Sequence, residues 1–155
     1  MKIYLASDHA GFKLKNQIIG WVTEFGYEPV DLGPFVYHEG DDYPDFIKLA
    51  AKEVSADPEN CRAIILGGSG EGEAIVANRF PKVRACVYYG GNREIIKLAR
   101  QHNDANVLVL GARTTGIQTA IDMTLTFLSQ SFEGGRHQRR VDKLNHLPNT
   151  KGDQS

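Results

Sequence analysis

Residues 67–73 combine a glycine-rich turn with the hydroxyl of Ser69 and the carboxylate of Glu73. They follow the apolar run 63–66, which has the length of a buried strand, and a helical pattern begins near Glu71. Glycines let consecutive backbone N–H groups converge, and a helix start adds positive potential, so this turn can hold an anion or an oxyanion. A carboxylate disfavours a purely anion-binding role, because like charges repel. The combination indicates a site that removes a proton and stabilises the resulting oxyanion.

Two familiar kinds of glycine-rich loop do not fit this turn. A Walker phosphate loop needs a lysine and then a serine or threonine after its last glycine, whereas Gly72 is followed by Glu73 and Ala74. A dinucleotide-binding loop follows the first strand of its fold, whereas this turn follows the third predicted strand. We therefore expect no nicotinamide or flavin cofactor. Because no His, Cys or carboxylate cluster has the spacing of metal ligands, we also expect no metal.

The elements that must position this turn form a regular alternation of strands and helices. Strands are predicted at 2–7, 27–32, 63–66, 83–89 and 107–110, and helices at 12–25, 43–55, 73–80, 93–101 and 115–129. This alternation is typical of an α/β fold. We predict a Rossmann-like three-layer sandwich with a five-stranded parallel sheet.

In such folds ligands bind beyond the carboxyl ends of the strands. Asp8 and His9 follow the first predicted strand, the glycine turn follows the third, and Arg113 follows the fifth. We expect these groups to share one edge of the sheet, together with the imidazole of His102. Taken singly, His102 is more often a histidine that interacts with a helix dipole than a catalyst, and Asp8 with His9 is also typical of a plain polar loop.

Positive charge is concentrated in the segment 132–144. Arg136 and Arg140 are four residues apart, so on a helix both guanidinium groups lie on one face, in the geometry of a phosphate clamp. A charged run is usually a solvated helix face. Here the two glycines that precede Arg136 favour a backbone arranged for close approach to a ligand.

The 155 residues carry a net charge of −1, and 41% of them are hydrophobic. We predict one domain over 1–147 and a flexible polar tail over 148–155. The small net charge offers no field for nucleic acid or for a membrane surface, so neither is an expected partner. We find no signal peptide and no membrane span, and therefore expect a cytoplasmic protein. Cys61 and Cys86 are expected to be reduced thiols.

Six motifs are spread in order along residues 1–145, at 7–11, 42–45, 68–72 with 77–79, 100–106, 111–113 and 134–140. Together they resemble the ribose-5-phosphate isomerase B family, also called the RpiB/LacAB sugar-phosphate isomerases. Many members carry a cysteine base where this chain has Gly67, and neither Cys61 nor Cys86 replaces it. The chain is instead similar to the branch in which a glutamate, here Glu73, is the base.

The resemblance implies a reversible, cofactor-independent isomerisation of ribose 5-phosphate and ribulose 5-phosphate through a cis-enediolate. Glu73 would move the proton between C1 and C2, and His102 would assist ring opening. Ser69, Asn103 and the turn amides would hold the oxyanion. The other substrate contacts that it implies are Asp8, for sugar hydroxyls, the turn residues Gly68, Gly70, Glu71 and Gly72, the phosphate-binding residues His9, Arg113, Arg136 and Arg140, and the additional positions Tyr43 and His137.

Family sites are completed by a neighbouring subunit, so the resemblance also implies a homodimer or a dimer of dimers with shared sites. The length of the sugar stays open. Alternative substrates are four-carbon (erythrulose 4-phosphate type) or six-carbon (allose or galactose 6-phosphate) sugars, and the loop 33–42 is expected to contribute to the choice. A non-catalytic module that binds a sugar phosphate is a further alternative.

Two effects on the pKa of Glu73 oppose each other. A helix start stabilises a carboxylate anion, which lowers the pKa of the group and weakens it as a base. We expect burial against Ile75 or against a partner subunit to offset this effect.

Overall fold

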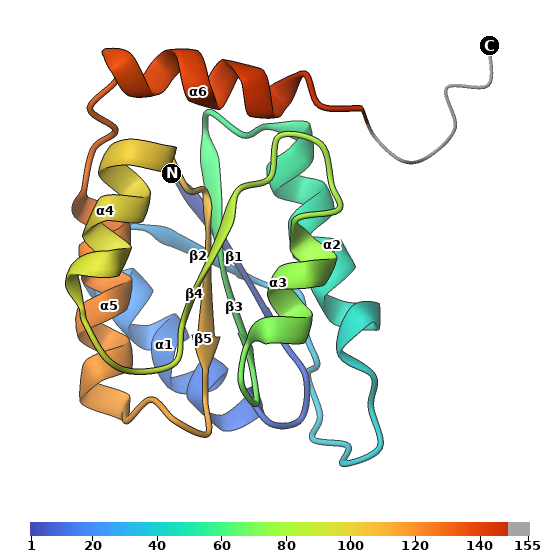
Figure 1. Cartoon of the computed structure of the whole chain (residues 1–155). Coiled ribbons are helices and arrows are strands. Elements are labelled where there is room, and N and C mark those ends of the chain that lie inside the picture. Colours follow the sequence, from blue (N-terminus) through green and yellow to red (C-terminus); the bar gives the residue numbers. More distant parts are fainter. Residues whose placement is uncertain (149–155) are drawn as a thin grey trace, which may run out of the picture.

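Five parallel strands in the order β2-β1-β3-β5-β4 form the central sheet of the structure, a computed structural model in which residues 1–148 are described (Figure 1). The strands are β1 (Lys2–Ser7), β2 (Glu28–Asp31), β3 (Cys61–Gly67), β4 (Ala85–Tyr88) and β5 (Val107–Gly111). The predicted α/β fold with a five-stranded parallel sheet is confirmed.

Helices cover both faces of the sheet. One face packs against α1 (Phe12–Glu24), α4 (Glu94–Asn103) and α5 (Ile117–Ser129), and the other against α2 (Tyr43–Ala56) and α3 (Glu71–Ala77). Successive side chains of β3 pack alternately into the cores on the two faces, since Ile64 packs on the α1 side and Ile65 on the α2 side. Because both faces are buried, the central strands are continuous apolar runs.

Helix α6 (Arg136–Asn145) lies outside these layers, across the end of the sheet at which the strands begin (Figure 1). Arg84 directly precedes β4, and its Nη1 lies 3.4 Å from Oδ1 of Asn145. None of the helices within residues 1–148 is both long and apolar enough to cross a membrane. From residue 149 on, the predicted tail 148–155 lies outside the described residues.

The predicted element boundaries differ from the observed ones where polar side chains or turns intervene. Helix α3 ends at Ala77, because the Asn78 side chain pairs with the backbone of Ala85 at 2.8 and 3.2 Å and thereby joins the helix to β4. Helix α5 begins at Ile117, because the amides of Thr114 and Thr115 donate to the carbonyl of Gly111 in a turn.

Candidate active site

The glycine turn connects β3 to α3 at the edge where the strands end. Gly70 has a φ of +87°, and a Cβ there would lie 3.0 Å from a methyl carbon of Val109, so both conformation and space favour glycine. The amides of Ala112 and Arg113 donate to the carbonyls of Gly67 and Gly68 at 2.7 and 3.1 Å. These bonds join the turn to the end of β5 and hold its backbone in place.

The Glu73 side chain folds back from the first turn of α3 toward the end of β3. The residue is only 4% exposed. A Cβ on Gly67 would overlap with the carboxyl group of Glu73, so that group occupies the space that a side chain at position 67 would fill. Glycine at position 67 is therefore what makes room for the acid.

Burial is the main reason that the pKa of Glu73 lies above its ordinary value of 4.5. The negative charge of Asp8 acts in the same direction, and a hydrogen bond from the backbone of Glu73 acts against it. The expected burial against Ile75 is wrong, since Ile75 is 58% exposed. Burial arises instead at the end of β3, and a carboxyl group with a raised pKa is better suited to accept a proton near neutral pH.

Two side chains bracket the turn. The Arg113 guanidinium lies over Gly68, with Nη1 3.1 Å from the position that a Cβ would take there. The Tyr43 ring lies against Gly72, with Cζ 2.7 Å from the corresponding position. The glycines at 68 and 72 thus let an arginine and a tyrosine approach the backbone of the turn.

Asp8 and His9 lie at the same edge, after β1, as the topology rule predicts. Asp8 is buried, and its Oδ1 accepts a hydrogen bond from the amide of Gly11 at 3.2 Å. The His9 ring nitrogen Nδ1 lies 2.7 Å from Oδ1 of Asp41. Asp41 was missed by sequence reasoning, because it belongs to the irregular loop 33–42, and the only signal was its place directly before the 42–45 motif.

His102 and Asn103 do not join this group within one chain. They end α4, and Asp104 after them is bound at 2.8 and 3.1 Å by Arg84, which directly precedes β4. The expectation that His102 shares an edge with Glu73 is therefore wrong for a single chain. A helix that follows β4 and leads into β5 must end where the strands begin.

A second cluster forms around His102 at this far end. Its ring stacks on that of His137, with centroids 4.2 Å apart, and Glu133 Oε2 lies 3.9 and 3.8 Å from the two Nε2 atoms. Burial, His102 and the nearby arginines lower the pKa of His137, which favours a neutral imidazole. Arg136 and Arg140 lie on α6 beside this cluster. The chain thus carries two clusters of candidate site residues, at opposite ends of its sheet.

Within residues 1–148, two groups bring three possible metal-binding atoms within 4.8 Å of one another. They are His102 with Glu133 and His137, and Asp8 with His9 and Asp41. The first lies beside Arg136 and Arg140, whose charge opposes a cation. In the second, Nδ1 of His9 already pairs with Asp41. We assign neither group to a metal.

The two cysteines lie away from Glu73. Cys61 begins β3 and Cys86 lies within β4, and both are free thiols. Burial raises the pKa of Cys86 to about 12 and also raises that of Cys61. Neither thiol is suited to replace the acid as a base.

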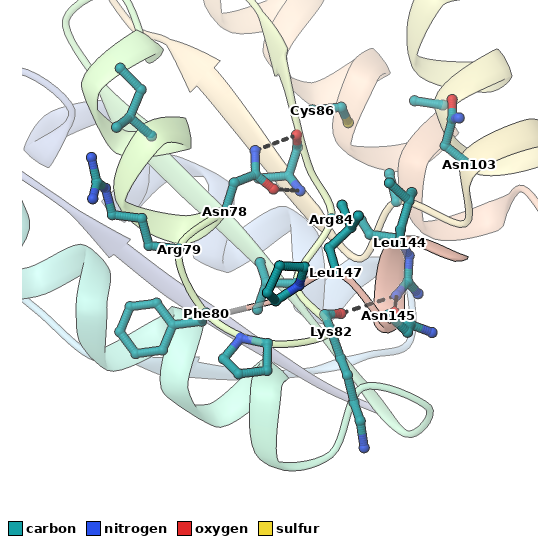
Figure 2. Close-up of a pocket in the computed structure, with 17 residues that line it drawn as sticks. Asn78, Arg79, Phe80, Lys82, Arg84, Cys86, Asn103, Leu144, Asn145 and Leu147 are labelled. Atoms are coloured by element: carbon teal, nitrogen blue, oxygen red, sulfur yellow. Dashed lines mark hydrogen bonds between the residues drawn. The ribbon is translucent and has the colours of Figure 1, made fainter. Parts of the chain in front are cut away.

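A cavity of about 750 Å³ opens between α3, β4, α4 and α6, close to Asn103 (Figure 2). Leu144 and Leu147 line it and are 48% and 64% exposed, and Ile75 lines it from α3. Leu98 on α4 is also exposed. This side of the molecule therefore presents apolar side chains next to Asn103.

Comparison with known proteins gives consistent results. The family model described as Ribose/Galactose Isomerase matches residues 3–144. Ribose-5-phosphate isomerase B of Mycolicibacterium paratuberculosis is 42% identical over 145 residues, which cover 93% of this chain and 89% of that protein. The same enzyme of Mycobacterium tuberculosis, strain H37Rv, is 39% identical, with 93% and 88% covered.

Solved structures agree with these sequence matches. The crystal structure of ribose-5-phosphate isomerase B from Mycoplasma genitalium with bound ribulose 5-phosphate has a TM-score of 0.89 and 39% identity, and 93% of each chain is covered. The enzyme from Clostridium thermocellum has a TM-score of 0.86 and 41% identity, with 94% of this chain and 95% of that chain covered.

Proposed function

The chain belongs to the ribose/galactose isomerase family and interconverts ribose 5-phosphate and ribulose 5-phosphate, and we propose that Glu73 is the base of this reaction. The observation that carries the proposal is the position of the Glu73 carboxyl group in the space beside Gly67. Many members of the family place a cysteine base at that position. Here an acid from the next turn of the chain reaches the same space.

The reaction needs a base that can take a proton and return it. The Glu73 carboxylate removes the proton from C2 of the open-chain aldose, the C–H electron pair forms the C1–C2 double bond, and the carbonyl oxygen becomes an oxyanion. In the cis-enediolate the proton of the C2 hydroxyl passes to the C1 oxygen. The electron pair left on the C2 oxygen then forms the carbonyl of the ketose, while the double bond takes the proton back from Glu73 at C1. Burial supports both steps, because a raised pKa brings the acid and its conjugate base closer in free energy.

The turn supplies donors for the developing oxyanion. The turn lies between the end of β3 and the start of α3, and the helix start adds positive potential. The Ser69 hydroxyl oxygen accepts a hydrogen bond from the amide of Glu71 at 3.3 Å, so its own proton is free to be donated. We assign Ser69 and the turn amides to the oxyanion, and Asp8 to the sugar hydroxyls.

We propose that the functional unit is a homodimer, so that each chain carries two half-sites, and that the cluster around His102 in one copy faces Glu73 of the other. His102, Asn103, Arg136 and Arg140 would then complete a site that already contains Arg113, His9 and the glycine turn. The exposed apolar side chains of α3, α4 and α6 support an interface on this side. Because a two-fold axis repeats this arrangement, the dimer would contain two complete sites, each built from both chains.

Substitution of the α6 arginines tests the phosphate clamp. We expect Arg136→Ala and Arg140→Ala each to raise KM for ribose 5-phosphate about tenfold or more, because each removes a charge-assisted hydrogen bond to phosphate. The matched control is Arg139→Ala, an exposed arginine on the same helix. Steady-state kinetics measure the effect. A KM in the first two variants equal to that of the control would contradict the clamp.

Solvent deuterium tests catalysis and substrate choice together. In D2O, ribulose 5-phosphate formed from ribose 5-phosphate is expected to carry deuterium at C1, since the abstracted proton exchanges on the base. A module that only binds the sugar leaves both carbons unlabelled. The same assay with four-carbon and six-carbon aldose phosphates is expected to give slower labelling, and faster labelling of either would reassign the preferred substrate.

A further inference from the structure

The loop 33–42 is fixed at both of its ends. At the first end, the fully buried Lys15 donates hydrogen bonds to Asp31 Oδ1 at 2.6 Å and to the carbonyl of Pro34 at 3.0 Å. At the other end, the carboxylate of Asp41 binds the segment that follows β1. The loop is therefore anchored to the edge of the sheet at which Glu73 lies.

Asp41 binds His9 twice through one oxygen. Its Oδ1 accepts from the backbone amide of His9 at 3.0 Å and lies 2.7 Å from the ring nitrogen Nδ1. The ring of Tyr37, from the same loop, lies nearly perpendicular to the imidazole, with centroids 6.4 Å apart. These contacts fix the ring and leave Nε2 as the nitrogen available to a ligand.

The hydrogen bond to Asp41 also determines whether Nε2 can donate a hydrogen bond. In a neutral imidazole whose Nδ1–H is donated to Asp41, Nε2 carries no proton and can only accept. A phosphate oxygen needs a donor, so a useful Nε2 requires the doubly protonated ring. Asp41 favours that form, because its side chain is only 8% exposed and, within residues 1–148, its second oxygen has no hydrogen-bond partner.

The charged groups around the ring act in both directions. The hydrogen bond with Asp41 is the largest cause that raises the pKa of His9, and the charges of Asp8 and Asp41 add to it. Burial and the Arg113 guanidinium oppose this effect, and the net pKa lies above the ordinary value of 6.5. Asp41 thus makes the largest contribution to the raised pKa of the ring.

We propose that Asp41 is a positioning residue, which holds His9 through Nδ1 as an imidazolium whose Nε2–H donates to the phosphate of the substrate. The inference rests on the phosphate-binding role that the family resemblance gives to His9. It adds a residue of the loop 33–42 to the machinery for substrate binding.

The test compares Asp41→Asn with Glu39→Gln, which removes a carboxylate from an exposed position of the same loop. We expect NMR titration of the His9 ring nitrogens to give a lower pKa in Asp41→Asn and an unchanged pKa in Glu39→Gln. At neutral pH, KM for ribose 5-phosphate should rise about tenfold in Asp41→Asn, with kcat within about threefold. Comparison at equal pH cancels the ionisation of the substrate phosphate.

The pH dependence has a defined sign. KM of the wild type should rise as the pH rises through the pKa of His9, and in Asp41→Asn this rise should begin at lower pH. In a His9→Gln background, Asp41→Asn should leave KM unchanged, because Asp41 acts through the ring. A penalty that persists there would assign Asp41 to loop structure and overturn the inference.

Two other results separate this inference from the proposed function. An unchanged His9 titration in Asp41→Asn, with a raised KM in His9→Gln, overturns the inference alone. A wild-type KM in His9→Gln overturns the phosphate role of His9 together with the inference, and leaves the assignment of Glu73 as base intact.

Discussion

Replacement of Glu73 by glutamine is expected to lower kcat for ribose 5-phosphate by about 10²- to 10⁴-fold, with a small change in KM. Glutamine keeps the shape of the side chain in the space beside Gly67, but it cannot take a proton. The steady-state turnover rate and the rate of deuterium labelling should fall together, because both depend on proton abstraction. Activity within a few-fold of wild type would assign the base to another residue.

Stability provides the control for this variant. Because the folded-state pKa of Glu73 is raised, the native protein binds its proton more tightly than the unfolded chain does. Ionisation at neutral pH therefore costs native stability, and this cost vanishes below about pH 4, where both states are protonated. Thermal unfolding should show Glu73→Gln at least as stable as wild type at neutral pH, with the difference shrinking as the pH falls.

A second variant moves the acid and keeps it in the chain. Gly67→Ala adds a methyl group that overlaps with the carboxyl group of Glu73, so the carboxylate must leave its place. We expect kcat to fall in this variant as well. In a Glu73→Gln background the same alanine should cause little further loss, which separates displacement of the base from general damage to the turn.

The sequence was sufficient to predict the sheet and one edge of the site. Apolar runs marked β1, β3, β4 and β5, and the rule that ligands bind at carboxyl ends placed Asp8, Arg113 and the glycine turn together. The exposure of Ile75 was also predictable from helix geometry, since two residues correspond to about 200° of rotation. If Glu73 faces the sheet, Ile75 faces away from it.

Other features depend on contacts that no local pattern encodes. The insertion of β5 between β3 and β4 is a long-range pairing. The contact between Asp41 and His9 spans 32 residues and an irregular loop. The position of His102 could have been predicted, because a helix between two parallel strands runs back to the end of the sheet at which the strands begin. The sequence analysis placed it with Glu73 instead, because an imidazole fits the chemistry of that edge.

A mixture of two impaired variants, Glu73→Gln and His102→Ala, is expected to regain activity if one copy completes the site of the other. A hybrid dimer combines the two intact halves in one site and the two defects in the other. Random reassociation makes about half of the dimers hybrid, so the mixture should reach about a quarter of wild-type activity per chain. The measurement is the initial rate with ribose 5-phosphate after co-refolding, with light scattering to report the size of the particles.

The matched control mixes Glu73→Gln with Ser69→Ala. Both of these residues belong to the same half-site, so no arrangement of two such chains restores a complete site, and the activity should stay low. Recovery in the first mixture alone follows from the direction of α4, which carries His102 to the end of the sheet opposite Glu73. If differently tagged chains exchange and the first mixture still gains nothing, each chain must assemble its site alone, and α6 would have to move from its place beside α4 to reach the acid.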